Sequence, residues 1–401
     1  MDDFIIIGSG IAGHHAASEL CRKAPGHNVQ VVGAELGRPY DRPPLSKEYL
    51  LTAEPVHPEL RPSEIYGSNV ALRDGLSATS IDRQNRTVTL ADGSQVHYDK
   101  LLLATGSRLR QLHLPHVDPR RIFYLRTLED AQRLRRALCE SPRVAIIGGG
   151  FIGLEVAAAA RVRGCTVTVL ERAPLLLSRA ATPKLSEFAR ALHIKRGVKV
   201  LVDLEAGEIF EESGEIILRW PGGELRSDIL VVGIGVVPNS ELGSQCGLAT
   251  ADGILVDQQC RTSDGAIFAA GEVTNYPIGR HGLRARTESW SSACAQGVVA
   301  AKNMMGQDRC FNELPWFWSD QYDINIQCIG LPTKASRFLQ IGDLASNSWL
   351  QVGIDDAGHV IGAEGVNRGR DISALRRASR SGQSIPAALV EQLIRIEPVN
   401  R

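Results

Sequence analysis

Near its start the chain reads Phe4-Ile5-Ile6-Ile7-Gly8-Ser9-Gly10-Ile11-Ala12-Gly13, and Val144-Ala145-Ile146-Ile147-Gly148-Gly149-Gly150-Phe151-Ile152-Gly153 repeats the pattern. In each copy an apolar run leads into glycines spaced Gly-x-Gly-x-x-Gly, which predicts a strand that turns tightly into a helix. Glycine permits the turn, lets the backbone approach a pyrophosphate, and packs the helix against the strand. The helix N-terminus offers free N–H groups to the phosphates. Two such turns predict two bound dinucleotides, and hydride transfer between them is the economical reason to bind both.

Both turns are followed by the acidic residue that a dinucleotide site needs about 20 positions further on, to bond the adenosine ribose hydroxyls. The strand predicted after the first turn ends at Glu35, and the strand predicted after the second ends at Glu171. The alternative is that both turns are plain connections without a ligand. Because strand, turn, helix, strand and acid recur twice in the same order, we favour two dinucleotide sites.

Composition argues against several classes of function. Lys plus Arg and Asp plus Glu both number 45 in 401 residues, so no net field favours nucleic acid or an anionic membrane as partner. The eight cysteines include no Cys-x-x-Cys pair, so no metal site and no dithiol centre is predicted. Scattered cysteines suit the reducing cytoplasm. We identify no signal peptide and no membrane-spanning run, and the oligomeric state stays open.

The chain divides into three predicted domains. Residues 1–106 read as a strand–helix–strand unit, then a proline-rich loop over residues 38–47, then further strands. Residues 107–235 contain the second unit, residues 236–314 return to the first domain, and residues 315–401 hold alternating strand patterns and a terminal helix. We therefore predict an α/β fold with two Rossmann-like dinucleotide-binding domains and a smaller α+β C-terminal domain.

Motifs spread over nearly the whole chain carry a resemblance to a known family. The most specific are Pro43-Pro44-Leu45-Ser46-Lys47 and Pro315-Trp316-Phe317-Trp318-Ser319-Asp320-Gln321. The others are Ala104-Thr105-Gly106, Tyr124 to Asp130, Gly148 to Glu155, Gly235 to Asn239, Phe268 to Glu272 and Glu288-Ser289-Trp290. Together they resemble the FAD- and NADH-dependent ferredoxin reductases of bacterial oxygenase systems, of the putidaredoxin reductase and aromatic-ring dioxygenase reductase type. The resemblance implies a glutathione-reductase-like arrangement, with a domain for FAD (residues 1–106 and 236–314) and one for NADH (residues 107–235).

The resemblance also implies a role for particular residues. FAD would occupy the first turn, with Glu35 on its ribose, Lys47 near its ring and Glu272 on its ribityl chain. NADH would occupy the second turn, with Glu155 near the nicotinamide and Glu171 on the ribose. The other residues expected to contact one cofactor or the other are Gly8, Gly10, Ala12, Gly13, Arg42, Pro43, Ala78, Ala104, Thr105, Gly106, Arg126, Gly148, Gly150, Ile152, Gly153, Gly235, Gly271, Ser289, Trp290 and Trp318.

Two positions depart from the family pattern. The family turn normally reads Gly-Asp, whereas this chain has Gly271-Glu272, so a backbone shift or a water bridge would have to absorb one extra methylene. The aspartate often found before Glu35 is Ala34 here, which leaves one carboxylate for the first ribose.

Three residues are predicted to be catalytic: Lys47, Glu155 and Trp318. A cation beside the flavin ring stabilises its reduced form, which favours Lys47 over the reading of a surface lysine. Glu155 is expected in the first turn of its helix, where a carboxylate gains from the dipole whatever its function, and a Lys47–Glu155 pair is expected. Trp316 and Trp318 alternate with Phe317, so both point to one face of an extended segment, although core packing alone could explain them.

Cofactor and partner choice are predicted from charge. Glu171 would bond the free ribose hydroxyls of NADH and repel the 2′-phosphate of NADPH, a preference that the adjacent Arg172 could soften. Ferredoxins are generally acidic, so a local cationic patch is expected to dock the [2Fe-2S] ferredoxin. The candidate arginines are 280, 284 and 286, or 368, 370, 376, 377 and 380, where the second set could equally be a solvated helix face.

We thus predict a flavoprotein that passes electrons from NADH through FAD to a ferredoxin, which feeds a P450 monooxygenase or an aromatic-ring dioxygenase. One alternative is a flavin disulfide or peroxide reductase, which is disfavoured because residues 36–50 contain no cysteine and Cys21 lies too early in the chain. The other is a redox-gated partner protein resembling apoptosis-inducing factor, disfavoured because no targeting or basic tail segment is recognised.

Overall fold

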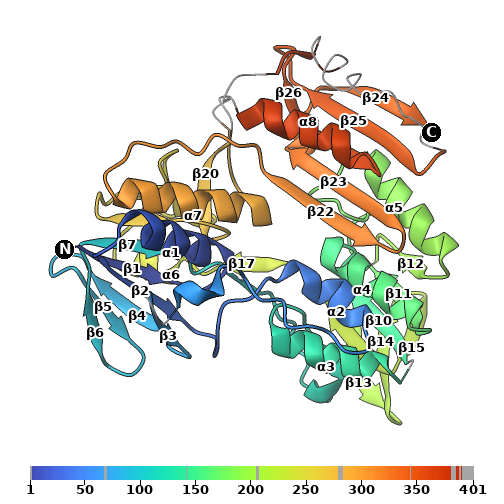
Figure 1. Cartoon of the computed structure of the whole chain (residues 1–401). Coiled ribbons are helices and arrows are strands. Elements are labelled where there is room, and N and C mark those ends of the chain that lie inside the picture. Colours follow the sequence, from blue (N-terminus) through green and yellow to red (C-terminus); the bar gives the residue numbers. More distant parts are fainter. Residues whose placement is uncertain are drawn as a thin grey trace.

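The structure is a computed structural model, and it describes residues 2–66, 70–140, 142–204, 207–278, 283–343, 345–380, 385–387 and 390. Three five-stranded sheets organise these residues (Figure 1). The first sheet, with the N-terminus, lies at the left of the view, the second at the lower right and the third at the upper right. The predicted fold class is confirmed. Two of the sheets are parallel and have flanking helices, and the third is antiparallel and is accompanied by one helix.

The first sheet has the strand order β19-β7-β1-β2-β3, and all of its pairings are parallel. Its strands are β1 (Asp3–Ile7), β2 (Asn28–Gly33), β3 (Ala71–Asp74), β7 (Lys100–Leu103) and β19 (Ile267–Ala269). Helices α1 (Ile11–Lys23) and α7 (Trp290–Met304) pack against each other beside it (Figure 1). Since β19 pairs with β7, the chain returns to this sheet after it has built the second one.

The second sheet has the strand order β12-β11-β10-β16-β9 and is also parallel throughout. Its strands are β9 (Ile122–Phe123), β10 (Arg143–Ile147), β11 (Thr166–Leu170), β12 (Lys199–Leu201) and β16 (Ile229–Val232). Its helices are α3 (Leu128–Leu138), α4 (Phe151–Val162) and α5 (Pro183–Lys195). Between β12 and β16 the chain forms a separate antiparallel sheet of β13 (Glu208–Glu212), β14 (Glu215–Trp220) and β15 (Gly223–Ser227).

The third sheet is antiparallel, with the order β22-β23-β26-β25-β24. Its elements are β22 (Trp316–Gln321), β23 (Ile324–Gly330), β24 (Arg337–Asp343), β25 (Ser348–Ile354), β26 (Val360–Val366) and helix α8 (Gly369–Arg380). The remaining elements are η1 (Pro43–Ser46), α2 (Glu48–Leu51), η2 (Ser63–Ile65), β4 (Ala78–Asp82), β5 (Thr87–Leu90), β6 (Gln95–His97), β8 (Ser107–Leu109), η3 (Pro119–Arg121), β17 (Val236–Pro238), α6 (Glu241–Gln245), β18 (Ile254–Leu255), β20 (Thr274–Ile278), β21 (Leu283–Arg286) and η4 (Pro332–Lys334).

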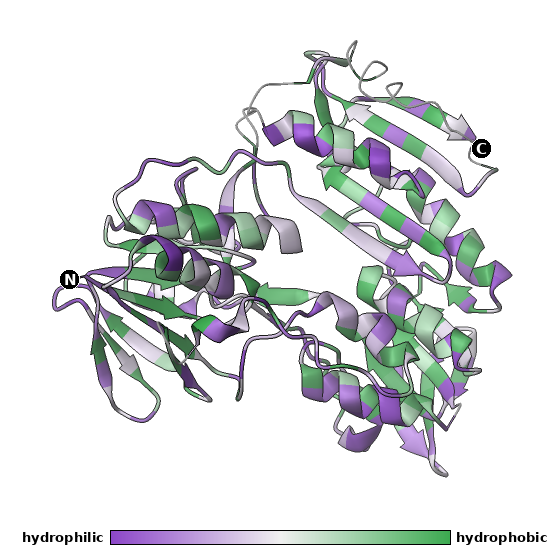
Figure 2. Cartoon of the chain, in the orientation of Figure 1, coloured by the Kyte–Doolittle hydropathy of each residue, from purple (hydrophilic) through white to green (hydrophobic). Residues whose placement is uncertain are grey.

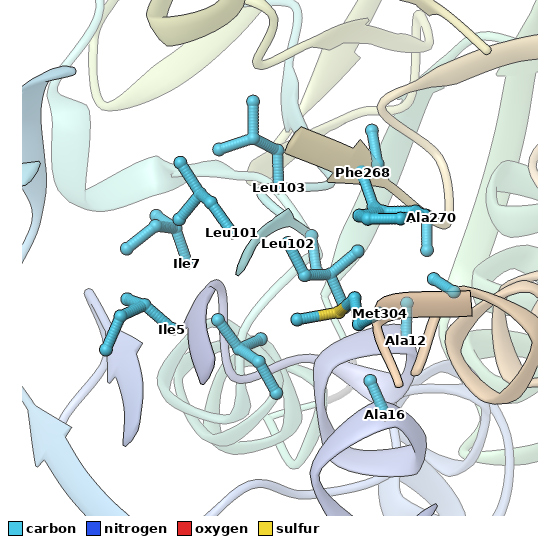
Figure 3. Packing of buried hydrophobic residues seen from close by; sticks show 14 of the residues in the cluster. Ile5, Ile7, Ala12, Ala16, Leu101, Leu102, Leu103, Phe268, Ala270 and Met304 are labelled. Atoms are coloured by element: carbon cyan, nitrogen blue, oxygen red, sulfur yellow. The ribbon is translucent and has the colours of Figure 1, made fainter. Parts of the chain in front are cut away.

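The central strands of the first sheet are apolar without alternation, because helices or loops cover both of its faces. Leu101, Leu102 and Leu103 are successive and all fully buried, although successive side chains point to opposite faces. Figure 2 shows the same concentration of apolar residues on the inner strands, with polar residues toward the outside. In Figure 3 the side chains of β1, β7 and β19 gather with Ala12 and Ala16 of α1 and Met304 of α7.

The third sheet shares a hydrophobic core with the second domain. Ile326, Trp349 and Val366 belong to the same buried cluster as Leu185 and Ala189 of α5. The ring of Trp349 meets the ring of Phe188 edge to face, with centroids 5.9 Å apart. Helix α5 is therefore packed between the second sheet and the C-terminal sheet.

A buried carboxylate also joins these two parts of the chain. Glu364 of β26 is fully buried and accepts hydrogen bonds from the Thr182 backbone N–H, at 3.1 Å, and from the Thr182 hydroxyl. Thr182 precedes the first residue of α5, so Glu364 satisfies donors that a helix N-terminus leaves without partners. Burial raises the pKa of Glu364, against a smaller lowering by Thr182.

Glu364→Leu is expected to destabilise the protein by about 1–3 kcal/mol, because the Thr182 N–H is then buried without a partner. Glu364→Gln keeps an acceptor and is the matched control. Because the folded-state pKa of Glu364 lies above its unfolded value, its contribution to stability is full at low pH and declines as pH rises through the folded pKa. Measured by thermal denaturation, the stability of the parent protein relative to Glu364→Gln should therefore decrease as pH rises above the usual carboxyl range. Equal stability of the Leu and Gln variants would contradict the expectation.

Candidate functional site

The two predicted glycine turns have nearly the same backbone geometry. Gly8 and Gly148 have φ of +111° and +108°, a region that L side chains rarely adopt. A Cβ on Gly8 would lie 2.1 Å from the carbonyl oxygen of Ala104, and one on Gly148 would lie 2.3 Å from that of Gly233. Each turn therefore passes so close to the next strand that only glycine fits.

The middle glycines differ, because each faces open space. Gly10 and Gly150 have extended backbone, and a Cβ on either would meet no atom within 4 Å. Helices α1 and α4 begin directly after them, with no side-chain cap and no acidic residue in the first turn. Helix N-terminal N–H groups without a competing carboxylate fit an anion such as a pyrophosphate.

The third glycines hold helix and strand together. A Cβ on Gly13 would lie 1.9 Å from the oxygen of Gly8, and one on Gly153 would lie 2.1 Å from that of Gly148. The residues of both turns thus fit the three roles that a dinucleotide site requires of its glycines.

Glu35 lies at the end of β2 beside the first turn. A hollow beside the first turn is lined by Ser9, Gly10, Glu35 and residues 36–40 and 42. The Glu35 carboxylate accepts hydrogen bonds from the Tyr40 hydroxyl and the Arg42 guanidinium. Burial raises the pKa of Tyr40 to about 12, so this hydroxyl remains a donor. Tyr40 was not predicted, because its only signal is its position in the proline-rich loop.

Glu171 lies at the corresponding place beside the second turn. One carboxylate oxygen accepts from the Gly149 N–H and the other from the Ala173 N–H, each at 2.7 Å. The carboxylate is therefore held at the edge of the turn by backbone donors. Both acids that the spacing predicted lie next to their glycine turns.

Glu272 is accommodated by an arrangement that the sequence did not predict. Its carboxylate accepts from the Ser107 hydroxyl at 2.5 Å and from the Arg126 guanidinium at 2.8 Å. Desolvation alone would raise the pKa of Glu272, but Arg126 and Ser107 outweigh it and hold the pKa below its usual value. The Glu272 carboxylate thus forms an ion pair within the protein with Arg126, which was expected to reach FAD.

The predicted pair between Lys47 and Glu155 is confirmed, with Nζ 3.0 Å from Oε2. Ser46 also donates to Oε2, and Ser319 donates to Oε1 at 2.6 Å. Glu155 is 3% exposed. Burial raises its pKa, and Lys47, Ser319 and Ser46 oppose that shift. Three segments far apart in the chain thus build one ionic centre around the buried Glu155: η1 with the residue after it, α4 and β22.

The expectation that Glu155 lies in the first helical turn is wrong. Helix α4 begins at Phe151, so Glu155 is its fifth residue and lies beyond the reach of the free N–H groups. Its negative charge is offset by Lys47 and the hydroxyls of Ser46 and Ser319, and the dipole of α4 contributes little there.

Three tryptophans gather beside this centre. The ring of Trp318 stacks on that of Trp316, with centroids 5.1 Å apart, which confirms that both point to one face of β22. Trp290 of α7 meets Trp318 edge to face at 6.0 Å and donates its ring N–H to Asp41 at 2.7 Å. Lys47 Nζ lies 5.8 Å from the Trp318 ring centroid. The structure therefore brings together Lys47, Glu155, Trp290 and Trp318.

Other predicted residues lie at the end of β7 and at the start of α7. Ala104 follows β7, and Thr105 exchanges two hydrogen bonds with Asn239 through its hydroxyl and its carbonyl. Ser289 caps α7 and also donates to the Trp316 carbonyl at 2.7 Å.

The remaining predicted residues have the following surroundings. Ile152 is 47% exposed at the start of α4, which suits a residue lining an open ligand site. A Cβ on Gly271 would contact Ala12, and one on Gly235 would contact Arg179. Pro43 opens η1, Ala78 opens β4, and Gly106 has φ of +62°.

Three of the described arginines expected to dock a partner form ion pairs: Arg286, Arg368 and Arg380. Arg284 donates to the backbone carbonyls of Val256 and Asn275, and Arg286 pairs with Asp252 and Glu288. In the other set, Arg368 pairs with Asp371, Arg380 pairs with Glu313, and Arg376 lies over the ring of Trp316 at 4.4 Å. Arg280 lies outside the described residues. Pairing leaves less positive charge on both surfaces than the residue types suggest.

Comparison with known proteins agrees with this geometry. Residues 2–297 match the pyridine nucleotide-disulphide oxidoreductase family, and residues 316–393 match the reductase C-terminal family. The ferredoxin–NAD(+) reductase component of the anthranilate 1,2-dioxygenase system of Burkholderia cepacia is 43% identical over 387 residues, which are 95% of each chain. The corresponding component for 3-phenylpropionate/cinnamic acid dioxygenase of Photorhabdus laumondii subsp. laumondii is 37% identical, over 93% of this chain and 95% of that protein.

Solved structures are similar over the whole length. The covalent putidaredoxin reductase–putidaredoxin complex contains a chain of 33% identity with a TM-score of 0.89, which covers 97% of this chain and 95% of that one. The ferredoxin reductase for the CYP199A2 system from Rhodopseudomonas palustris has 36% identity and a TM-score of 0.90, with 97% of both chains covered. Within the part of the chain that the structure describes, no helix has both the length and the apolarity needed to cross a membrane. With its two glycine turns and its C-terminal sheet, the chain belongs to the pyridine nucleotide-disulphide oxidoreductase family.

Proposed function

We propose that this protein is an FAD-dependent NADH:ferredoxin oxidoreductase that supplies an oxygenase with electrons. The observation that carries the proposal is the cluster of Lys47, the buried Glu155 and Trp318, which the FAD-side loop, the second domain and the C-terminal sheet build together. A flavin and a nicotinamide bound at the two dinucleotide turns could stack where these three parts of the chain meet. When bound, FAD would take a hydride from NADH and release single electrons to a [2Fe-2S] ferredoxin.

The residues of the chain bind and orient the cofactors. The turn at Gly8 to Gly13 would receive the FAD pyrophosphate, and Glu35 would bond its ribose. The turn at Gly148 to Gly153 would receive NADH, and Glu171 would bond its ribose. Lys47 places a cation where negative charge increases as the ring is reduced, and Glu155 fixes that cation.

The cysteines argue against a disulfide or peroxide reductase. Residues 36–50, which hold the loop with Lys47, contain no cysteine. Cys294 lies on α7, one helical turn from Trp290, but burial raises the pKa of its thiol to about 12. A thiol with such a pKa is almost entirely protonated at neutral pH and is a poor nucleophile. Cys21 lies on α1, half-buried.

A stopped-flow experiment in two stages tests the proposal. The FAD-loaded protein is first mixed with NADH, and rapid bleaching of the flavin absorbance is expected. A [2Fe-2S] ferredoxin is then added, and its reduction is expected without turnover of a disulfide substrate. Bleaching by NADH without reduction of several ferredoxins would favour the redox-gated partner protein, and a flavin that NADH does not reduce would refute the enzyme.

The electron acceptor and the setting follow from the same proposal. The ferredoxin would feed a P450 monooxygenase or an aromatic-ring dioxygenase, in the cytoplasm. The CYP199A2 reductase is 36% identical to this chain and the anthranilate 1,2-dioxygenase component is 43% identical, which supports both kinds of oxygenase.

Glu171 is expected to set the preference for NADH. Replacing Glu171 by glutamine keeps an acceptor oxygen for one of the Gly149 and Ala173 N–H groups, turns the other oxygen into an amide nitrogen, and removes the negative charge that would face a 2′-phosphate. Like charges placed against each other cost several kcal/mol, so KM for NADPH should fall by about ten- to a hundredfold in Glu171→Gln. Steady-state kinetics with both cofactors measures this. If the ratio of the KM values for NADPH and NADH were unchanged in Glu171→Gln, Glu171 would not face the ribose.

A further inference from the structure

A continuous chain of hydrogen bonds runs from Glu155 away from the tryptophans to helix α5. Ser319 Oγ lies 2.6 Å from Glu155 Oε1, and Gln321 Nε2 lies 3.0 Å from Ser319 Oγ. His193 Nε2 lies 2.9 Å from Gln321 Oε1. Ser319, Gln321 and His193 are each fully buried. A buried polar network costs free energy unless every member has its hydrogen-bond partners. The end of this network at Glu155 therefore suggests that it serves the carboxylate.

The chemistry of the groups fixes the direction of these bonds. A carboxylate only accepts, so Ser319 donates its proton to Glu155. The Ser319 oxygen therefore accepts from the amide nitrogen of Gln321, and the Gln321 carbonyl oxygen faces His193. His193 must then carry its proton on Nε2, which leaves Nδ1 to accept from the Tyr322 hydroxyl at 3.3 Å. Every donor points toward Glu155.

Burial preserves this direction at working pH. Burial lowers the pKa of His193, against a smaller opposing effect of the Gln321 bond, so the ring is neutral with a single proton. Burial also raises the pKa of Tyr322 to about 12, against the nearby Arg161 and Arg196, so its hydroxyl remains a donor. The chain can therefore run only toward the carboxylate.

Each end of this hydrogen-bond chain has charged groups beside it. At the Glu155 end the cation is Lys47, on Oε2. At the Tyr322 end, Arg196 lies over the ring at 5.0 Å and pairs with Asp323. Ser46 and Lys47 both act on Oε2, so Ser319 is the side chain that holds Oε1.

We propose that Ser319, Gln321 and His193 are positioning residues that hold the Glu155 carboxylate in one orientation and in its charged form opposite Lys47. The effect reaches Glu155 of α4 from α5 through β22, so it depends on how the C-terminal sheet is seated on the second domain. This inference rests on the proposed function, because it assigns the residues that prepare Glu155 for it.

The test is the pH dependence of Glu155 in Ser319→Ala. Without the Ser319 proton the buried carboxylate is harder to ionise, so its titration midpoint should rise by about one pH unit. Two measurements report it: the acid limb of flavin reduction by NADH in single turnover, and the infrared carbonyl band of the protonated Glu155, assigned by subtraction of Glu155→Gln. Ser319→Thr restores a hydroxyl and should return the midpoint toward the parent value.

The matched control is Ser291→Ala. Ser291 is also buried and its hydroxyl also bonds β22, at the Trp316 carbonyl, but it does not contact Glu155. Its midpoint should equal that of the parent protein. Gln321→Leu and His193→Phe keep Ser319 and should shift the midpoint in the same direction by a smaller amount, so they carry the test if Ser319→Ala fails to fold.

The outcomes separate the two proposals. A midpoint in Ser319→Ala or Gln321→Leu equal to that in Ser291→Ala overturns the positioning role and leaves the reductase intact. Failure of NADH to bleach the parent protein overturns the reductase, while the infrared midpoint, which needs no turnover, still decides whether the chain acts on Glu155.

Discussion

Lys47→Ala is expected to slow flavin reduction by NADH by about 10²- to 10³-fold, the usual effect of removing one fixed charge-stabilising group. The Lys47 side chain is 11% exposed and lies between Glu155 and the face of Trp318. Its ammonium group would therefore act in a site with little water, where a charge is worth more than in solution. The rate is measured by stopped-flow bleaching of the FAD-loaded protein.

The control for this variant must separate chemistry from folding, because Lys47→Ala also leaves Glu155 as a buried charge without its cation. Breaking such a pair costs about 3–5 kcal/mol. Adding Glu155→Gln to Lys47→Ala removes the unpaired charge and should recover most of the thermal stability without recovering the rate. An unchanged reduction rate in Lys47→Ala would place Lys47 outside the site, and a rate restored in the double variant would mean that the loss was structural.

The nucleotide turns could be predicted from the sequence because the glycine spacing that marks them is local. Gly8, Gly10 and Gly13 are defined by their spacing. Gly13 packs against Gly8 within the same strand–turn–helix unit, whereas the close neighbour of Gly8 is Ala104 of a distant segment. Glu35 and Glu171 follow at a distance set by one helix and one strand. A pattern of this length is repeated in the chain, which makes a chance match improbable.

The centre at Glu155 could be predicted only in part, because its partners come from distant segments. The pair with Lys47 followed from family motifs, but Ser319 lies 164 residues from Glu155 along the chain, and no local pattern links the two. The position of Glu155 in its helix was misjudged because the start of a helix is read from sequence only to within a turn. As a result, the stabilisation of the Glu155 charge was attributed to the helix dipole, whereas it comes from the side chains of Lys47, Ser46 and Ser319.

Arginines illustrate a second limit of sequence reasoning. Residue types suggested two cationic patches, but the net charge of a patch depends on which acids fold beside it. Arg286 pairs with Asp252 of another segment as well as with Glu288 two residues further on, and Arg380 pairs with Glu313 of another segment. The same holds at Arg126, whose pairing with Glu272 could not be foreseen from either motif.

Substitutions in the two glycine turns should affect the binding of one cofactor each. Gly10→Ala should lower the affinity for FAD by roughly a hundredfold, and Gly150→Ala should do the same for NADH. Both positions have extended backbone that alanine adopts without strain, and a Cβ at either meets no protein atom within 4 Å. The new methyl group therefore occupies the space of a pyrophosphate and weakens its charged hydrogen bonds, by about 3 kcal/mol in total.

These two variants control each other because the perturbation is the same and only the site differs. Gly10→Ala should be purified largely without yellow colour yet unfold at nearly the same temperature as the FAD-free parent protein. Gly150→Ala should keep its flavin and show a raised KM for NADH with normal reduction by dithionite. Gly8→Ala marks the opposite case, because its Cβ would meet the Ala104 oxygen at 2.1 Å and should destabilise the fold itself. If Gly150→Ala lost FAD, or Gly10→Ala retained it at full occupancy, the assignment of FAD to the first turn and NADH to the second would be wrong.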